Sequence, residues 1–478
     1  MAVTMGRNYT LIVTETGTVF SCGQNRYGQL GLGSEADEQS QQMLPVPIKL
    51  FNAHDGEDED AVMVSAKSHH SACVTRQGSV WTWGCGASGQ LGIADTYRRH
   101  EPTPQRVYCT QMGRSPAVMV SCGAHHTLVL TAAGHVWSCG SNQQGQIGQQ
   151  DLVGSPNPNF ENISELTMID PVRFGHADGS TRIAFIAAGY EHSMAISHDS
   201  GVLWTWGRNE GGQLGHPGNY PSDHNYSHVH VPKALPSETF GEPVEFAAAD
   251  ALYSMVVTAS GMVWGCGYDH CGVLGTGQKQ SIGAFRRVGG EDRFGTGGAR
   301  TVACSRHHTL IVAHDASLWA CGNTLSHGLG RNTGTAAGYL VHTRVDAAHF
   351  DHGQVAIAAV HEQGSTAVSV SGQVYTWGYS IPNIHVGLGY NCPHIQWTPR
   401  MIIEASFSMQ RIGRWHCLPE ADLLAFVMGV HCRLGAATTY LDLSSEMLAA
   451  ISEGHRCLCL HGCGLGLRNL LGVGTNVL

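Results

Sequence analysis

The 478-residue sequence contains few charged residues, since lysine, arginine, aspartate and glutamate together make up 13% of it. Soluble proteins usually contain about 25% of these residues, so turns and small polar side chains must supply much of the polar surface. The sequence also has no apolar run of about 18 residues, which excludes a membrane-spanning helix. Its first residues, MAVTMGRNYT, contain no apolar signal core. We therefore expect a protein of the cytoplasm or nucleus that is neither secreted nor membrane-bound.

Signatures of common catalytic sites are missing as well. The sequence has no G-K-[ST] phosphate loop, no G-x-S-x-G nucleophile turn and no H-E-x-x-H zinc helix. Its glycine-rich stretches superficially resemble phosphate loops, but strand-like segments flank them on both sides and they recur along the chain. We therefore predict that they are structural turns, and that the protein has no catalytic residues and no cofactor.

Glycine, in contrast, is abundant at 61 residues, and it marks an internal repeat. The segment GTVFSCGQNRYGQLG at 17–31 returns as GSVWTWGCGASGQLG at 78–92 and in five further copies. The glycines that close the aromatic run lie 55 to 67 residues apart, which is room for about four short strands in each copy. These glycines are Gly23, Gly84, Gly140, Gly207, Gly267, Gly322 and Gly378.

Each copy of the repeat predicts a β-hairpin. Side chains alternate between the two faces of a strand, so Trp81 and Trp83 share one face, as do Trp204 and Trp206. A glycine with positive φ is expected in the preceding turn. The sixth copy has Ala316 at that place, so we expect its turn to differ.

A hydroxyl residue recurs upstream of every hairpin and usually follows a histidine, as in His126-Thr127 and His192-Ser193. Because the hydroxyl keeps one register in all seven copies, we predict that it binds the backbone of a neighbouring strand or turn. The histidines would be spread around a ring by radial symmetry. A shared metal site is therefore not predicted.

Together, G-x-x-H-[ST], G-x-[VL]-[WY]-x-[WC]-G and G-Q-L-G resemble the regulator of chromosome condensation repeat, over about residues 1–405. The resemblance implies an all-β fold, a seven-bladed β-propeller. The first copy lacks the proline-rich outer segment seen at 102–107, whereas WTPRMIIEA follows the last copy at 397–405. We therefore predict that the ring closes by exchange of a terminal strand, with 397–405 in the same sheet as residues 2–13.

We predict a propeller over 1–410 and a short C-terminal helical extension over 411–478, with helices at 418–435 and 441–453. The second helix resembles the opening of an F-box. The chain then ends in a glycine- and cysteine-rich stretch whose alternate-residue spacing is too tight for a tetrahedral zinc site, so no metal is predicted. The residues of that stretch are Cys457, Cys459, His461 and Cys463.

The sixteen cysteines are expected to be reduced, because no secretion signal is present. Four of them occupy the slot that tryptophan fills in other copies and are predicted to be small buried side chains. These four are Cys22, Cys139, Cys266 and Cys321.

Two irregular segments are candidate partner-binding loops, because loops on a rigid scaffold often carry function. Acidic residues gather at 52–61, which is either a solvated loop or an electrostatic contact for a basic partner. Histidines gather at 216–232, by chance or as a metal-binding pair at His228 and His230. The candidate residues are Asp55, Glu57, Asp58, Glu59, Asp60, His224, His228 and His230.

The resemblance implies two classes of function. Founding members of the family catalyse nucleotide exchange on a Ran-type GTPase and bind chromatin, but this chain has a net charge of −10 and lacks the clustered lysines and arginines that phosphate backbones favour. Other members are non-enzymatic scaffolds. We predict a monomeric scaffold that binds a protein partner and no nucleic acid. Nucleotide exchange is one alternative, and a ubiquitin-ligase adaptor acting through the F-box-like tail is another.

Overall fold

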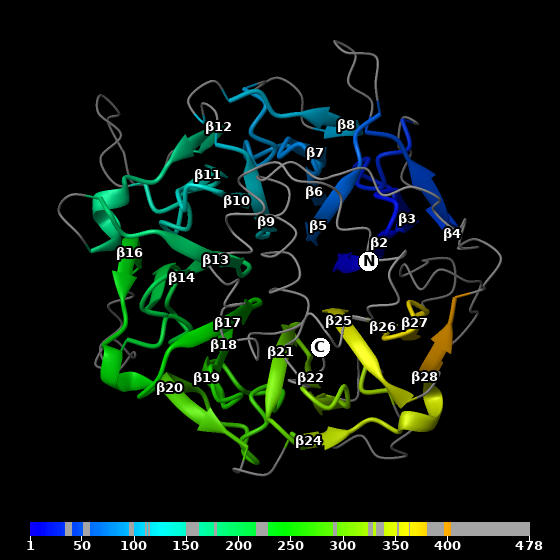
Figure 1. Ribbon diagram of the computed structural model, residues 1–478, viewed down its shortest axis with the longest axis vertical. Coiled ribbons are helices and arrows are strands. Elements are labelled where there is room, and N and C mark those ends of the chain that lie inside the picture. Colours follow the sequence, from blue (N-terminus) through cyan, green and yellow to red (C-terminus); the bar gives the residue numbers. More distant parts are fainter. Residues whose placement is uncertain are drawn as a thin grey trace, which may run out of the picture. The chain divides into compact units, whose positions relative to one another are not determined.

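The computed structural model describes residues 1–402 except 34–40, 51–57, 95–99, 110–111, 113–114, 150–161, 176–178, 217–227, 290–293, 324–327, 331–338, 351–352, 363 and 380–395. The described residues form seven four-stranded sheets, each built from four consecutive strands. In Figure 1 the sheets surround a common axis, with the first strand of each toward the centre and the fourth on the outside. The predicted all-β, seven-bladed propeller is confirmed.

The blades are numbered along the chain. Blades one to four contain β1 (Ala2–Gly6), β2 (Tyr9–Val13), β3 (Val19–Gln24) and β4 (Gln41–Ile48); β5 (Ala61–Lys67), β6 (His70–Thr75), β7 (Val80–Cys85) and β8 (His100–Arg106); β9 (Ala117–Cys122), β10 (His126–Thr131), β11 (Val136–Gly140) and β12 (Ile163–Met168); β13 (Ile183–Ala188), β14 (His192–Ser197), β15 (Leu203–Gly207) and β16 (Val229–Ala234). Blades five to seven contain β17 (Val244–Ala249), β18 (Tyr253–Thr258), β19 (Val263–Gly267) and β20 (Ile282–Val288); β21 (Ala299–Cys304), β22 (His308–Ala313), β23 (Leu318–Gly322) and β24 (Tyr339–Arg344); β25 (Val355–His361), β26 (Gly364–Ser369), β27 (Val374–Gly378) and β28 (Gln396–Met401). Short 3-10 helices η2 (Pro171–Phe174), η3 (Ser237–Thr239) and η5 (Ala347–His349) follow the fourth strands of blades three, four and six.

The apolar cores lie between neighbouring blades. Second strands such as β6 and β10 are buried at every residue, because another blade covers each of their faces. Trp81, Trp83, Trp204 and Trp206 lie in these cores, as the repeat predicted. The closing glycine of each third strand has a positive φ between 97° and 144°. At Gly84 a Cβ atom would lie 2.5 Å from the His69 carbonyl oxygen, so only glycine fits there.

The turn of the sixth copy does not differ from the others, so that expectation is wrong. Ala316 has a φ of 63°, and its N–H donates to Ala313 O at 3.0 Å. Gly261 occupies the same place in blade five, with a φ of 79° and an N–H that donates to Thr258 O at 2.8 Å. The paired strands on either side fix the turn, and Ala316 therefore takes a left-handed conformation that is costly for an L-residue.

The prediction of closure by strand exchange is also wrong. Strand β28 belongs to the sheet of β25, β26 and β27, whereas residues 2–13 form β1 and β2 in one sheet with β3 and β4. Blade one already has a proline-containing outer strand, β4, in which Pro47 pairs with Phe20, so 397–405 has no vacancy to fill there. Instead β1 packs against β25 and β26, and the Thr366 hydroxyl lies 3.3 Å from Met5 Sδ. The ring closes by packing of blade against blade.

Buried hydroxyl groups link neighbouring blades, which confirms their predicted role. Ser193 Oγ, for example, donates to Gln146 O of the preceding blade at 2.7 Å. The same arrangement recurs at six junctions between described residues. This hydroxyl belt consists of Ser71, Thr127, Ser193, Ser254, Thr309 and Ser365, which donate in turn to the carbonyl oxygens of Gln29, Gln90, Gln146, Gln213, Val273 and Gly328.

The repeated histidines complete the hydroxyl belt. Because Ser193 donates to a carbonyl, its oxygen is left to accept from His126 Nε2–H at 2.9 Å. Burial lowers the pKa of the belt histidines, to about 3 for His70, His192 and His308, so they are neutral at pH 7. The histidines that donate to belt hydroxyls are His70, His126, His192 and His308. At the other two junctions the Tyr9 and Tyr253 hydroxyls lie 2.9 Å from the hydroxyls of Ser71 and Thr309 and donate to the carbonyl oxygens of His70 and Ser305.

The aromatic-or-cysteine slot serves the same carbonyl oxygens. Trp206 Nε1 donates to Gln146 O at 3.0 Å, and the Cys266 thiol lies 3.4 Å from Gln213 O. Cysteine therefore replaces tryptophan with a smaller side chain and a weaker donor. Cys22, Cys139, Cys266 and Cys321 are all buried free thiols, as predicted.

The predictions for the C-terminal region lie outside the described residues. They are the boundary at 410, the helices at 418–435 and 441–453, the F-box-like segment, and the stretch from Cys457 to Cys463. Within the described part of the chain, no helix is long and apolar enough to cross a membrane.

Candidate functional site

The first strands of all seven blades enclose an axial cavity of about 250 Å³. Small side chains recur around its wall, because seven strands converge there and leave little room. The alanines that line it at one level are Ala187, Ala248, Ala303 and Ala359. Hydroxyls take their place in the first three blades and join neighbouring first strands, as where Thr4 Oγ1 accepts from Ala66 N at 3.3 Å.

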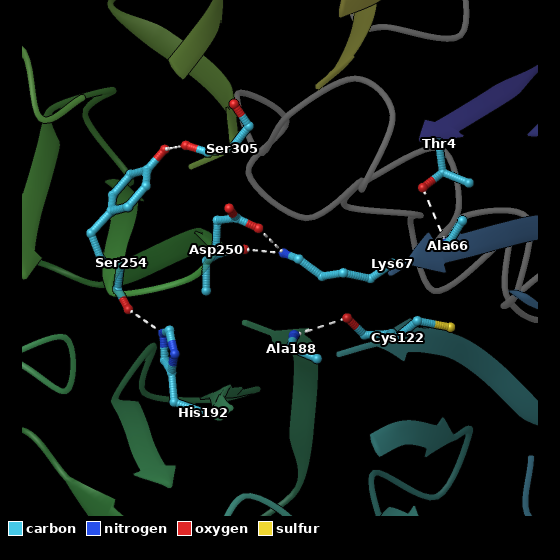
Figure 2. A network of polar contacts seen from close by, with 12 residues as sticks. Thr4, Ala66, Lys67, Cys122, Ala188, His192, Asp250, Ser254 and Ser305 are labelled. Atoms are coloured by element: carbon cyan, nitrogen blue, oxygen red, sulfur yellow. Dashed lines mark hydrogen bonds and ion pairs between the residues drawn. The ribbon is translucent and has the colours of Figure 1, made fainter. Parts of the chain in front are cut away.

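One end of the cavity carries a cluster of polar and charged side chains, here called the axial mouth: Arg7, Lys67, Tyr190, Asp250, His361 and Glu362. Figure 2 shows the Lys67 side chain reaching from blade two toward Asp250 of blade five. Lys67 Nζ lies 2.7 Å from Asp250 Oδ1 and also donates to Ala249 O at 2.7 Å. The two side chains are only 16% and 10% exposed. The ion pair therefore ties together two blades that are not neighbours in the ring.

Lys67 and Asp250 break the symmetry of the repeat. Each stands three residues before the first residue of a second strand, where blades three and four have Gly123 and Gly189. Glycine fits at Gly123 because the His126 ring folds over it, and a Cβ there would lie 2.1 Å from His126 Cε1. The sequence prediction missed this pair. The available signal was two opposite charges at a position that is glycine in blades one, three and four.

Burial shapes the electrostatics of the axial mouth. It raises the pKa of Tyr190 and lowers that of His361 well below its usual range, with the cations of Arg7 and Lys67 adding to the shift of His361. Both side chains are therefore neutral at pH 7. Among the described residues, no group of three or more histidines, cysteines, aspartates or glutamates could hold a metal ion. The arrangement provides charges and hydrogen-bonding groups for recognition.

The predicted acidic segment does not form one contact surface in its described part. Asp55 and Glu57 lie outside the described residues, and Asp58 is exposed. Glu59 is largely buried, 3.6 Å from Arg106 Nη1, and it accepts from Thr75 Oγ1 at 2.6 Å. Asp60 is exposed, with its Oδ2 4.0 Å from Arg76 Nε. Glu59 and Asp60 thus serve contacts within and beside blade two.

The predicted histidine segment is only partly described, since His224 lies outside the described residues. His228 and His230 are partly buried at the start of β16, with ring centroids 6.5 Å apart. Burial lowers the pKa of both. They do not belong to any metal-binding group among the described residues.

Comparison with known families gives a match to the model of the RCC1-like domain over residues 1–291. Among curated proteins, the ultraviolet-B receptor UVR8 of Arabidopsis thaliana is 34% identical over 214 residues, which are 45% of this chain and 42% of UVR8. The probable E3 ubiquitin-protein ligase HERC6 of Homo sapiens is 30% identical over 330 residues, which are 68% of this chain and 28% of HERC6. The chain therefore spans less than half the length of these relatives.

Solved structures share the propeller fold. Prp20p of Saccharomyces cerevisiae matches 83% of this chain and 88% of its own, with a TM-score of 0.67 and 18% sequence identity. Human WBSCR16 matches 81% of this chain and 94% of its own, with a TM-score of 0.65 and 19% identity. At these identities the likeness shows the fold alone.

Proposed function

The chain belongs to the RCC1-like domain family, and on that premise we propose that it is a non-enzymatic scaffold that binds a protein partner at the axial mouth and the turns around it. The axial mouth carries the proposal. It places the charged pair Lys67–Asp250 where blades one, three and four have glycine, on a ring that the hydroxyl belt holds together. Departures from a repeat on a rigid frame are where specific recognition is expected.

The relatives support a binding role more than a shared reaction. One is named a receptor and another a probable ubiquitin-protein ligase, yet this chain matches only 42% and 28% of them. A propeller common to proteins with such different names is more simply explained as a binding module. The same reasoning favours a protein partner for this chain. We expect the chain itself to be a monomer of the cytoplasm or nucleus.

Nucleotide exchange is tested directly by the release of labelled GDP from a Ran-type GTPase. We expect the intact chain to change the release rate by less than about tenfold, because a tenfold change needs about 1.4 kcal/mol of specific barrier lowering. A larger acceleration would overturn the non-enzymatic proposal. The ubiquitin-adaptor alternative depends on residues 443–451, which lie outside the described part of the chain.

Photo-crosslinking tests the proposed binding site. A photoreactive residue replaces Tyr190 at the axial mouth in one chain and exposed Met401 on outer strand β28 in another. Both chains are incubated with extract, and the crosslinked proteins are identified by mass spectrometry. We expect a defined protein partner from position 190 and background from position 401. Equal yields from both positions, or none from either, would contradict the proposal.

A further inference from the structure

The axial mouth is the centre of a wider surface, here called the turn face. It comprises the turns after the first strands and the loops after the third strands, which lie on the same side of the propeller because adjacent strands run antiparallel. Aromatic rings gather on it. Tyr27 lies 4.4 Å from His69 and 5.1 Å from His100 between ring centroids, and His125 meets Tyr190 edge-on at 6.3 Å. Partly buried rings of this kind are enriched in protein interfaces.

Most acidic groups of the turn face already have partners within the chain. Glu191 and Glu210 both form ion pairs with Arg208. Asp250 pairs with Lys67. These carboxylates are satisfied internally, and they neutralise Arg208 and Lys67 in return. The charge left to attract a partner must come from other side chains.

Those other side chains are mainly arginines. Arg7 and Arg306 are exposed, and neither forms an ion pair with a carboxylate among the described residues. The exposed Arg26 guanidinium lies 5.6 Å from the Tyr27 ring centre. The opposing charges are Glu362 at the axial mouth and the second carboxylate on Arg208, while Asp269 and Lys279 on the loop after β19 balance each other. The described turn face is therefore net positive, although the whole chain has a net charge of −10.

The neighbouring histidines add hydrogen-bonding edges without adding charge. Burial and nearby cations lower the pKa of His69 to about 4, and burial lowers that of His125. Both are therefore largely neutral at pH 7. The surface thus combines fixed guanidinium charges with neutral aromatic rings, the combination found at the energetic centres of protein interfaces.

We propose that the turn face binds a protein segment rich in aspartate and glutamate, with Arg7 and Arg306 as its carboxylate contacts. This inference rests on the proposed scaffold function and names its partner chemistry. Guanidinium groups hold carboxylates through charge-assisted, often bidentate, hydrogen bonds. A nucleic acid fits less well, because phosphate backbones need a continuous run of cations, whereas here Glu362, Glu191 and Asp250 interrupt the cations.

The test uses the full chain and a short fluorescent peptide of alternating glutamate and tyrosine, followed by fluorescence anisotropy. A lysine–tyrosine peptide and a single-stranded oligonucleotide of matched charge are the comparison probes. The double variant Arg7→Glu/Arg306→Glu reverses two charges on the turn face. Lys233→Glu/Arg286→Glu makes the same charge change at exposed positions of the outer strands β16 and β20. Arg7→Gln/Arg306→Gln removes the charges without reversing them, and circular dichroism checks that every variant is folded.

We expect the acidic peptide to bind the unmodified chain and to lose at least about tenfold in affinity in the turn-face variant. The outer-strand variant should stay within about twofold, and raising salt from about 50 to about 300 mM should weaken binding. Equal loss in both double variants, or tighter binding of the oligonucleotide or the lysine peptide, would overturn the inference. If position 190 still captures a protein partner in that case, the scaffold function stands and only the partner chemistry is wrong.

Discussion

The hydroxyl belt and the axial mouth are both polar and partly or wholly buried, but they differ in symmetry. The belt repeats one arrangement at six described junctions, with a hydroxyl that donates to a carbonyl of the preceding blade and contacts the side chain of a histidine or tyrosine. The axial mouth joins blades two and five through Lys67 and Asp250, a pair that occurs once among the described residues. A contact needed at every junction is read as structural. A contact that occurs once in the same ring is not required by the repeat and can take part in binding a partner.

The largest effect expected from this contrast is the loss of stability when the pH is lowered. His70, His192 and His308 have pKa values of about 3 because they are buried, whereas unfolded histidine titrates near 6.5. The unfolded chain therefore takes up protons first as pH falls. Stability is complete above about pH 6.5 and declines toward pH 3, by about 1.4 kcal/mol per histidine for each unit. We expect the thermal midpoint to fall steeply between about pH 6 and about pH 4.

The control for acid unfolding replaces single histidines. His192→Gln keeps a donor for Ser254 without a titrating ring, so it should flatten the pH dependence. His270→Gln alters an exposed histidine and should leave the dependence unchanged. A chain whose midpoint is constant down to about pH 4 would contradict the buried, neutral assignment of the belt histidines.

The axial ion pair should show a smaller and different effect. Lys67→Met leaves the Asp250 carboxylate buried without its cation, which costs about 3 kcal/mol in comparable cases. The double variant Lys67→Met/Asp250→Asn removes both charges and should lose less than the single variant. Chemical unfolding of the four chains of this cycle measures the coupling. A double variant as unstable as Lys67→Met would mean that the pair serves the fold in the way the belt does.

Loss of a single belt hydroxyl is expected to cost about 2 kcal/mol. Ser193→Ala leaves His126 Nε2–H without its acceptor and removes one of two donors to Gln146 O, while Trp206 remains. Ser237→Ala, at an exposed position in η3, is the matched control and should change stability by less than about 0.5 kcal/mol. Equal urea midpoints for the two variants would mean that the belt hydroxyl does not stabilise the fold.

The sequence was informative where the repeat is regular. The seven glycines from Gly23 to Gly378 and the hydroxyl register predicted the blades and the links between them. The prediction of how the ring closes was wrong, because Pro45 follows Gln24 only after a long intervening segment. The outer strand of blade one was therefore not recognised in the sequence. Lys67 and Asp250 could not be paired in advance, since they are 183 residues apart and meet only when the ring is closed.

The partner-binding predictions selected residues that the fold uses internally and missed the residues that it places on one face. A run of acids attracts attention in a sequence, yet Glu59 is used internally by Arg106 and Thr75. Arg7 and Arg306 are single residues in unremarkable segments. Only the fold places them on the same face.

The smallest expected effect is a gain in stability at a place where the sequence departs from its own repeat. Ala316 holds a left-handed turn at φ 63°, so Ala316→Gly removes a conformational cost of about 1 kcal/mol. Loss of a largely buried methyl group and the greater freedom of glycine in the unfolded chain offset part of the gain. We expect a net stabilisation of about 0.5 kcal/mol, measured as a higher urea midpoint. The reverse change in blade five, Gly261→Ala, should destabilise more strongly, because its Cβ would lie 2.7 Å from Gly297 O. If Ala316→Gly lowers the midpoint instead, methyl packing outweighs backbone strain at this turn, and the departure from the repeat is favourable in its own setting.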